Sequence, residues 1–262
     1  MNSREYWADR MSRMQAKLTT KNIKAVEKQL RKYYKTSMKK TIEDFENTYN
    51  KLLATQEEGK QPTTADLYKL DKYWSMQAQL RQELQKLGDR QISTLSKAFE
   101  LQFFDIYYSI ALEGKKAFNT INKAGAWQLI NSIWVADGKS FSQRVWDNTN
   151  QLIETLNEGL INCVIAGQKT SRLKKELQER FSVSYSRADS VVRTEMSHIQ
   201  NTAARQRYED YGIKEFEVWA DKDERLCEVC GKLHQKRYPM GTPSPVPVHP
   251  RCRCSILPVV ED

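Results

Sequence analysis

The sequence predicts a mainly α-helical fold, with long helices and a helical bundle followed by a small C-terminal zinc-stapled β-hairpin or loop module. Three observations support this fold class. Glycine and proline are scarce, at 10 and 7 of 262 residues, which favours helices over a sheet rich in turns. Apolar residues recur at helical spacing through most of the chain. Four of the five cysteines follow residue 226, in a tail that also holds six of the seven prolines.

The first long helix is expected over residues 3–53. Its apolar side chains recur at steps of three and four, so we expect them to form its buried face. These apolar residues are Trp7, Met11, Met14, Leu18, Val26, Leu30, Tyr34, Met38, Ile42, Phe45, Tyr49 and Leu52.

A basic stripe follows a second face of the same helix. It consists of Arg13, Lys17, Lys21, Lys24, Lys28, Arg31, Lys35 and Lys39. Between residues 11 and 40 the sequence has ten basic residues against one acid, Glu27. A run of charge is most often a solvated helix face. The scarcity of acidic partners, in a chain of net charge +9, favours a face that binds nucleic acid.

The middle of the chain is expected to be helical as well. We predict helices over 64–87 and 89–113, ended by Gly88 and Gly114. The second of these is apolar on most sides, which is typical of a helix in a bundle core or against a partner protein, and we favour the core. These boundaries suggest four segments: a basic helix at 1–54, a helical region at 63–135, a second helical part at 138–212, and the Cys/His module at 213–262.

Further helices are expected up to Gly212. One ends at Gly167 and places Cys163 beside its apolar stripe, as a small core residue. A short helix follows through Phe181, and Ser184 or Ser186 is expected to cap the next one. Beyond Gly212, residues 215–219 alternate like a short strand.

The C-terminal tail is expected to need a metal ion, because it has too little apolar surface to fold alone. Cys227 and Cys230 form a C-x2-C pair, and His249, Cys252 and Cys254 form a second cluster. C-x2-C suits zinc, since one tight turn aims both thiolates at a tetrahedral centre.

Five candidate ligands are present for the four positions of one structural zinc ion. Equal spacing in both pairs favours Cys227, Cys230, His249 and Cys252, with Cys254 as the close alternative. His234 is expected at the surface. The acids Asp221, Asp223 and Glu224 are expected to cap the turn before Cys227 rather than to act in catalysis, because four strong ligands favour a closed site.

These residues also carry a resemblance to the phage head morphogenesis proteins typified by protein F of phage Mu. The shared signature covers about residues 138–259. It comprises Val192-Arg193-Thr194-Glu195, Asn201, Ala203, Tyr208, Gly212, Trp219, Asp221, Arg225, Cys227, Cys230, His249-Pro250-Arg251-Cys252-Arg253-Cys254 and Pro258. The chain departs from the family pattern in the loop after C-x2-C, where Leu233-His234-Gln235-Lys236 replaces an expected Asn-Gly pair.

The resemblance implies a minor capsid protein of a tailed phage, located in the virion head near the portal vertex. It implies head assembly and retention or ejection of the genome as functions, with the portal protein, and also the major capsid or scaffolding protein, as partners. Phage DNA, bound without sequence specificity, is the remaining expected partner. Assembly would take place in the host cytoplasm, since the sequence contains no signal-peptide core and no run of membrane-spanning length.

No enzymatic activity is expected. Arg193 and Glu195 could suggest chemistry near a metal, but we expect them to dock their helix on the Cys/His module, because no nucleophile or general base accompanies them. The alternatives are a zinc-stapled nuclease and a DNA-binding regulator. The nuclease would need a His-based catalytic core with further His or Asn residues, and His198 and His234 are far from any such pattern. No helix-turn-helix or finger spacing supports the regulator.

Overall fold

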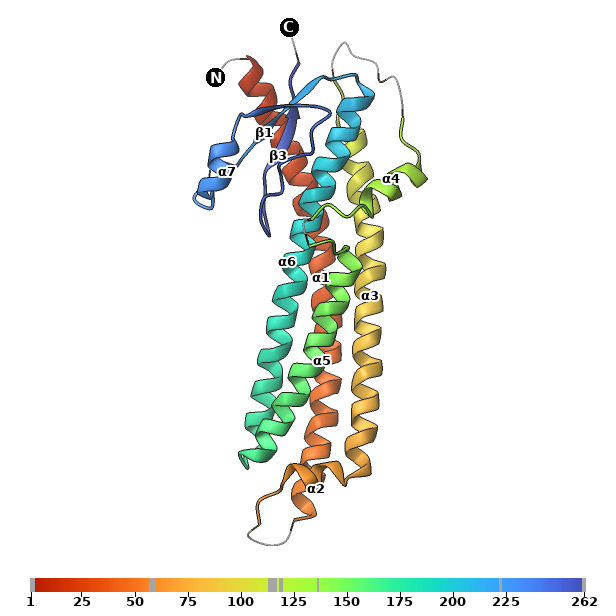
Figure 1. Cartoon of the computed structure of the whole chain (residues 1–262), viewed down its shortest axis with the longest axis vertical. Coiled ribbons are helices and arrows are strands. Elements are labelled where there is room, and N and C mark those ends of the chain that lie inside the picture. Colours follow the sequence, from red (N-terminus) through yellow and green to blue (C-terminus); the bar gives the residue numbers. More distant parts are fainter. Residues whose placement is uncertain are drawn as a thin grey trace. The chain divides into compact units, whose positions relative to one another are not determined.

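The computed structural model describes residues 3–56, 60–112, 117, 120–135, 137–221 and 223–260. Gly114 therefore lies outside the described residues. Seven helices and three strands are found in the described ranges: α1 (Ser3–Ala54), α2 (Thr64–Tyr68), α3 (Asp71–Ser109), α4 (Lys123–Ile130), α5 (Phe141–Ile165), α6 (Thr170–Asp210), β1 (Glu215–Trp219), α7 (Glu228–Leu233), β2 (Arg237–Pro239) and β3 (Ser255–Pro258) (Figure 1). The mainly helical fold class is confirmed. No helix in these ranges is long and apolar enough to span a membrane.

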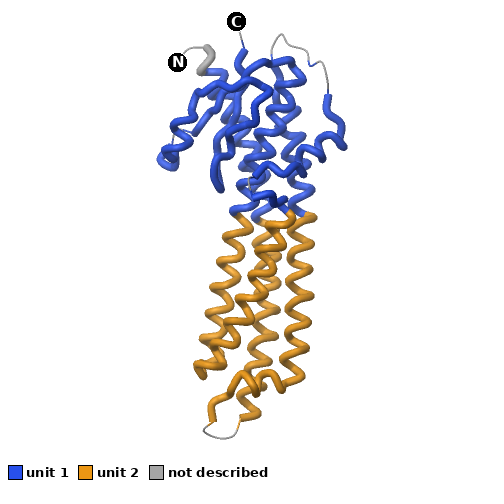
Figure 2. Tube along the Cα trace, viewed as in Figure 1, with its two compact units in different colours: residues 1–27, 94–141, 190–262 blue, residues 28–93, 142–189 orange. Residues whose placement is uncertain are grey.

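The chain divides into two compact units, and the long helices contribute segments to both (Figure 2). Unit 1 contains residues 1–27, 94–141 and 190–262, and it therefore includes the sheet and the Cys/His module. Unit 2 contains residues 28–93 and 142–189.

Helix α3 continues through Gly88, where the sequence predicted a break. A Cβ atom at this position would lie 2.6 Å from the ring of Trp146 on α5. Gly88 therefore allows two helices of unit 2 to approach closely, and its cost in helix propensity is small beside that packing.

Helix α6 is also one continuous element, where two helices were expected. Ser184 is buried inside it rather than capping a new helix, and its carbonyl oxygen accepts a hydrogen bond from Asn148 at 2.9 Å. The hydroxyl groups of Ser184 and Tyr34 lie 3.2 Å apart. A serine in mid-helix is tolerated here because these polar groups bond one another.

Unit 2 is a helical bundle formed by segments of α1, α3, α5 and α6, with α2 at one end (Figures 1 and 2). The predicted apolar face of α1 is buried in this unit from Leu30 to Leu52, apart from half-buried Met38. Cys163 on α5 is buried as well, and burial raises the pKa of its thiol to about 11. The prediction that Cys163 is a core residue is thus confirmed.

The first part of α1, in unit 1, matches the predicted apolar face only in part: Val26 is buried, whereas Met11, Met14 and Leu18 are half-buried. Its other buried side chains are polar, namely Ser12, Gln15, Thr19 and Asn22, whereas Trp7 is 49% exposed. These polar groups join a buried hydrogen-bond network. Thr19 donates to Gln200 of α6 at 2.6 Å, and Gln200 donates to Ser255 of β3 at 2.7 Å. Asn22 donates to Gln102 of α3 at 2.9 Å. Such a network fixes the register between helices, because each partner is needed to satisfy the others.

Replacing Gln200 by leucine is expected to lower the free energy of unfolding by about 2 to 4 kcal/mol, since the Thr19 donor and the Ser255 hydroxyl both lose a buried partner. Urea denaturation followed by circular dichroism measures this loss. Gln178→Leu, at an exposed position of the same helix, is the matched control. Equal stability of the two variants would contradict the role given to the network.

The C-terminal sheet has three strands in the order β2-β1-β3, with both pairs antiparallel. The strand predicted at 215–219 is confirmed as β1, whose three central residues are buried. The expected hairpin is only part of this arrangement, because β3 pairs with the other edge of β1. This pairing brings Cys254, which directly precedes β3, back toward the loop that carries the C-x2-C pair.

Candidate metal centre

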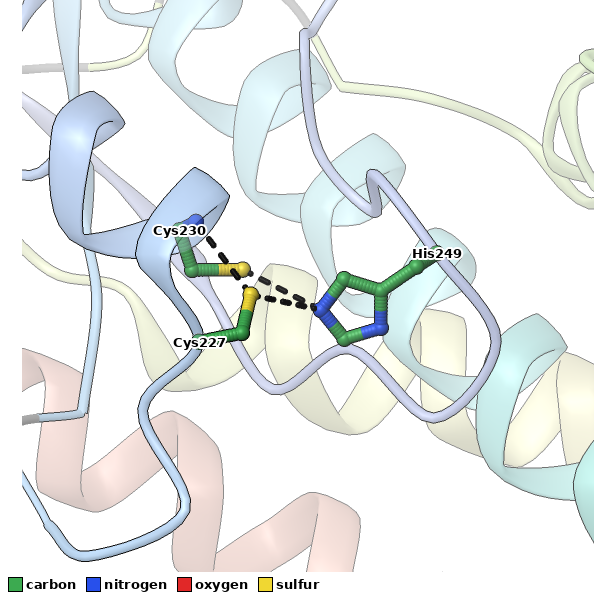
Figure 3. A group of neighbouring side chains, drawn as sticks. All are labelled: Cys227, Cys230 and His249. Atoms are coloured by element: carbon green, nitrogen blue, oxygen red, sulfur yellow. Dashed lines mark hydrogen bonds between the residues drawn. The ribbon is translucent and has the colours of Figure 1, made fainter.

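The first two candidate ligands lie at the start of α7. Cys227 is the N-cap residue, and its sulfur accepts a hydrogen bond from the backbone N–H of Cys230 at 3.4 Å. This hydrogen bond is the main reason that the pKa of Cys227 is lowered, because it stabilises the thiolate. The two sulfur atoms lie on the same side of the turn (Figure 3). The C-x2-C pair therefore has the geometry that a shared metal ion requires.

His249 completes a group of three around this turn. Its Nε2 atom lies 3.3 Å from the sulfur of Cys227 and 3.3 Å from that of Cys230 (Figure 3). The Nδ1 atom lies 2.9 Å from the carbonyl oxygen of Pro250. Because a carbonyl oxygen can only accept, Nδ1 carries a proton, and Nε2 of a neutral ring would offer its lone pair to a metal ion. This backbone contact orients the ring as a metal ligand is usually oriented.

Cys252 and Cys254 extend the cluster on the side of Cys230. The sulfur atoms of Cys230 and Cys252 are 3.8 Å apart, and Cys230, Cys252 and Cys254 form a second group whose sulfur atoms all lie within 4.8 Å of one another. All three residues of this second group are buried. Cys230 is common to both groups, so the five predicted ligand residues lie together around one cysteine.

The donor set fits a tetrahedral zinc ion. Zn–S and Zn–N bonds of about 2.3 and 2.0 Å place neighbouring sulfur atoms about 3.8 Å apart and sulfur and nitrogen about 3.5 Å apart. The sulfur atoms of Cys230 and Cys252 are 3.8 Å apart, and the sulfur of Cys227 lies 3.3 Å from Nε2 of His249, so both distances are close to those around a zinc ion. All five cysteines are free thiols, so none of the ligands is consumed by a disulfide. The structure thus contains a cysteine-rich cluster that could hold a metal ion.

An ion pair joins the two segments that carry the ligands. Arg253, between the last two cysteines, donates two hydrogen bonds to Asp223 at 2.7 and 2.6 Å. These bonds are the main reason that the pKa of the Asp223 carboxyl group lies well below its usual range. The acids before Cys227 were expected to cap their turn. Asp223 does accept from the backbone of Arg225, but its contact with Arg253 was not predicted.

One polar face of α6 forms hydrogen bonds with the segment that carries His249, Cys252 and Cys254 and with β3, which follows it. Thr194 accepts from the backbone N–H of Arg251 at 3.0 Å, and Tyr208 donates to the carbonyl oxygen of Ile256 at 3.1 Å. Between them, Asn201 donates to the carbonyl oxygen of Cys254 at 3.0 Å and accepts from the N–H of Ile256 at 2.9 Å. These three α6 residues are spaced by seven, so they lie along one face of the helix. Their spacing is visible in the sequence and could have indicated a docking face.

Arg193 and Glu195 have other contacts than those expected. Arg193 forms an ion pair with Glu27 of α1. Glu195 is buried and accepts a hydrogen bond from the indole N–H of Trp134 at 3.1 Å. Thr194, between them, provides the contact with the Cys/His module that was assigned to its neighbours. The three residues therefore link α6 to three different parts of unit 1.

The two remaining histidines are packed structurally. His234 was expected at the surface, but it is half-buried, and its Nδ1 atom accepts from the backbone N–H of Ala220 at 3.2 Å. His198 stacks on Trp134 with ring centroids 4.2 Å apart, and burial lowers its pKa to about 3. His198 is consequently neutral at pH 7.

The eight residues of the basic stripe are all exposed on α1. Arg13 pairs with Asp9 at 2.8 Å and Lys39 approaches Glu43 at 3.8 Å, and both pairs are too exposed to hold these cations firmly. In unit 1, Lys17, Lys21 and Lys24 line a shallow depression of the helix surface together with Ala16 and Thr20. The stripe is thus available to a polyanion.

Comparison with known protein families finds a match. Residues 154–257 match the sequence profile of the family described as Phage Mu protein F like protein. The match confirms the resemblance expected from the motifs, over less than half of the chain, and it includes every candidate ligand. The family is one of phage head proteins. No curated protein and no solved structure matches the chain significantly.

Proposed function

We propose that this chain, whose residues 154–257 match the phage Mu F-like family, is a minor head protein of a tailed phage that acts at the portal vertex. In this role it takes part in head morphogenesis and in retention or ejection of the genome. The observation that carries the proposal is the family match, because it spans both the α6 docking face and the whole Cys/His cluster. The portal protein is the main partner, and the major capsid or scaffolding protein is a further one.

The Cys/His cluster has a structural role in this proposal. Cys227, Cys230, His249 and Cys252 hold one zinc ion, with Cys254 as the alternative fourth ligand. The ion cross-links the loop that carries Cys227 and Cys230 to the loop that carries His249 and Cys252. The neighbouring strands have only three to five residues. Sheets of this size have little independent stability in water. The zinc site therefore keeps the module folded on α6.

DNA binding is assigned to the basic stripe of α1. The eight cations of the stripe are exposed and largely lack acidic partners, so they can neutralise phosphate groups without reading bases. This binding would hold the end of the packaged genome near the vertex.

Co-expression with the portal protein of the same phage tests the proposed position. We expect the two proteins to co-purify at moderate salt, and to remain together after nuclease treatment has removed any bridging DNA. Separate elution of two folded proteins would contradict a stable portal complex. A hydrolysis assay with magnesium or manganese is the companion measurement, because DNA cleavage would support the nuclease alternative instead.

A further inference from the structure

The outer face of the last turns of α3 carries apolar side chains that the described residues leave largely exposed. Leu101 is 53% exposed and Tyr108 is 62% exposed. Phe104 lies between them and is half-buried, with its ring stacked on that of Tyr108 at a centroid distance of 5.7 Å. Steps of three and four place these residues on one helix face. The sequence favoured an intramolecular core for this helical segment. Only the opposite face of the helix is buried in that way.

The buried side of the same segment is already complete. Its core residues are Phe99, Phe103, Ile106, Tyr107 and Ile110, each at most 1% exposed. Phe104 and Tyr108 touch this core only through edge contacts with Phe103 and Tyr107, and large aromatic side chains left at the surface cost solubility. An apolar stripe opposite a filled core is typical of an interaction surface.

Helix α1 forms one edge of this surface. The helices run in opposite directions, and Asn22 donates to both Gln102 and Asp105 of α3, at 2.9 and 3.1 Å. Leu18, one turn before Asn22 on the same face of α1, is half-buried. We call Leu18, Leu101, Phe104 and Tyr108 the α3 outer patch.

The charges around the α3 outer patch are unbalanced. Lys97 on α3 and Lys21 on α1 are exposed, and neither forms an ion pair with any residue that the structure describes. The nearby acids are engaged: Glu100 pairs with Lys123 at 2.7 Å, and Asp105 accepts from Asn22. The available charge at the rim is therefore positive.

We propose that the α3 outer patch binds an amphipathic helix of another protein, with apolar residues on one face and carboxylate groups beside them. The stripe of Leu101, Phe104 and Tyr108 covers two turns, which suits a helix laid along a shallow apolar surface. Acidic flanks would pair with Lys97 and Lys21. A second copy of this chain is disfavoured, because like charges would face each other across the contact. Zinc and DNA binding are not required for this interaction.

A defined peptide tests the chemistry of the patch. The probe is a 20-residue helix with leucine at steps of three and four and glutamate on both flanks, labelled for fluorescence anisotropy. The matched peptide has lysine on the flanks. We expect the full-length protein to bind the acidic peptide, and the variant L101Q/Y108Q to bind it roughly tenfold or more weakly. The control variant I165Q/V183Q alters two side chains that are 69% and 53% exposed in unit 2, and it should bind normally.

Photo-crosslinking identifies the occupant in assembled particles. A photoreactive phenylalanine analogue at position 108 should crosslink to an acidic amphipathic helix of another head protein, whereas the same group at position 183 should not. Equal binding of both peptides, or unchanged binding by L101Q/Y108Q, would overturn the proposal. Crosslinks to DNA or to a second copy of this chain would overturn it as well. DNA binding by L101Q/Y108Q should be unchanged, which separates this inference from the basic stripe.

Discussion

Replacing Cys230 by serine is expected to abolish metal binding and unfold the C-terminal module. Cys230 belongs to both groups of candidate ligands, so its loss removes a ligand whichever cysteine is the fourth. Structural zinc contributes about 10 to 16 kcal/mol of apparent binding free energy in zinc-finger peptides, far more than a single packing contact. The module should become sensitive to protease while the helices of unit 2 remain resistant. Limited proteolysis and zinc content per chain measure these effects.

Cys163→Ser is the matched control, because Cys163 is a buried free cysteine outside the cluster. It should keep one zinc ion per chain and the original digestion pattern. Two more variants distinguish Cys252 from Cys254 as the fourth ligand. Cys252→Ser should lose zinc as Cys230→Ser does, whereas Cys254→Ser should retain it. Unchanged zinc content and digestion in Cys230→Ser would contradict the metal site itself.

Reversing four charges of the basic stripe is expected to abolish non-specific DNA binding at moderate salt. The variant replaces Lys17, Lys24, Lys28 and Lys35 by glutamate, all of which are exposed on α1. Each phosphate contact contributes about 0.9 to the slope of log K against log salt concentration, so loss of four contacts should reduce that slope by about 3 to 4. Titration of a labelled duplex at several salt concentrations measures both changes.

A second charge-reversal variant controls for the fall in net charge. It replaces exposed Lys51, Lys69, Lys174 and Lys175 by glutamate and has the same net charge as the stripe variant. We expect it to keep most of the DNA affinity and the original salt slope. Equal losses in the two variants would show that DNA responds only to overall charge, and the stripe would then be a solvated helix face.

The features predicted correctly from the sequence depend on local patterns. The long first helix follows from periodicity over many turns, and β1 from alternation over five residues. The proximity of the five candidate ligands could be anticipated because cysteine and histidine at short spacings have few other roles in a tail so rich in proline, and metal binding by them stays a prediction. Their spacing could not select the fourth ligand, since Cys252 and Cys254 are both within reach of Cys230.

The features that were missed depend on partners far along the chain. Gly88 was expected to end a helix, and only the ring of Trp146 explains why the helix continues. Gln15 and Thr19 were not expected in a core, because their partners Tyr208 and Gln200 come from the other end of the sequence. Periodicity identifies an apolar face but gives no signal for a polar face that is buried by mutual hydrogen bonding.

The protein composition of purified phage heads tests the proposed assignment most directly. DNA-filled heads are isolated before tail attachment, and quantitative mass spectrometry compares this chain with the portal and major capsid proteins. We predict that the chain is present in a fixed and small ratio to the portal protein, and that it remains after salt and nuclease washes. Its absence from washed heads, with the protein recovered only in the soluble fraction of infected cells, would contradict a role as a head component.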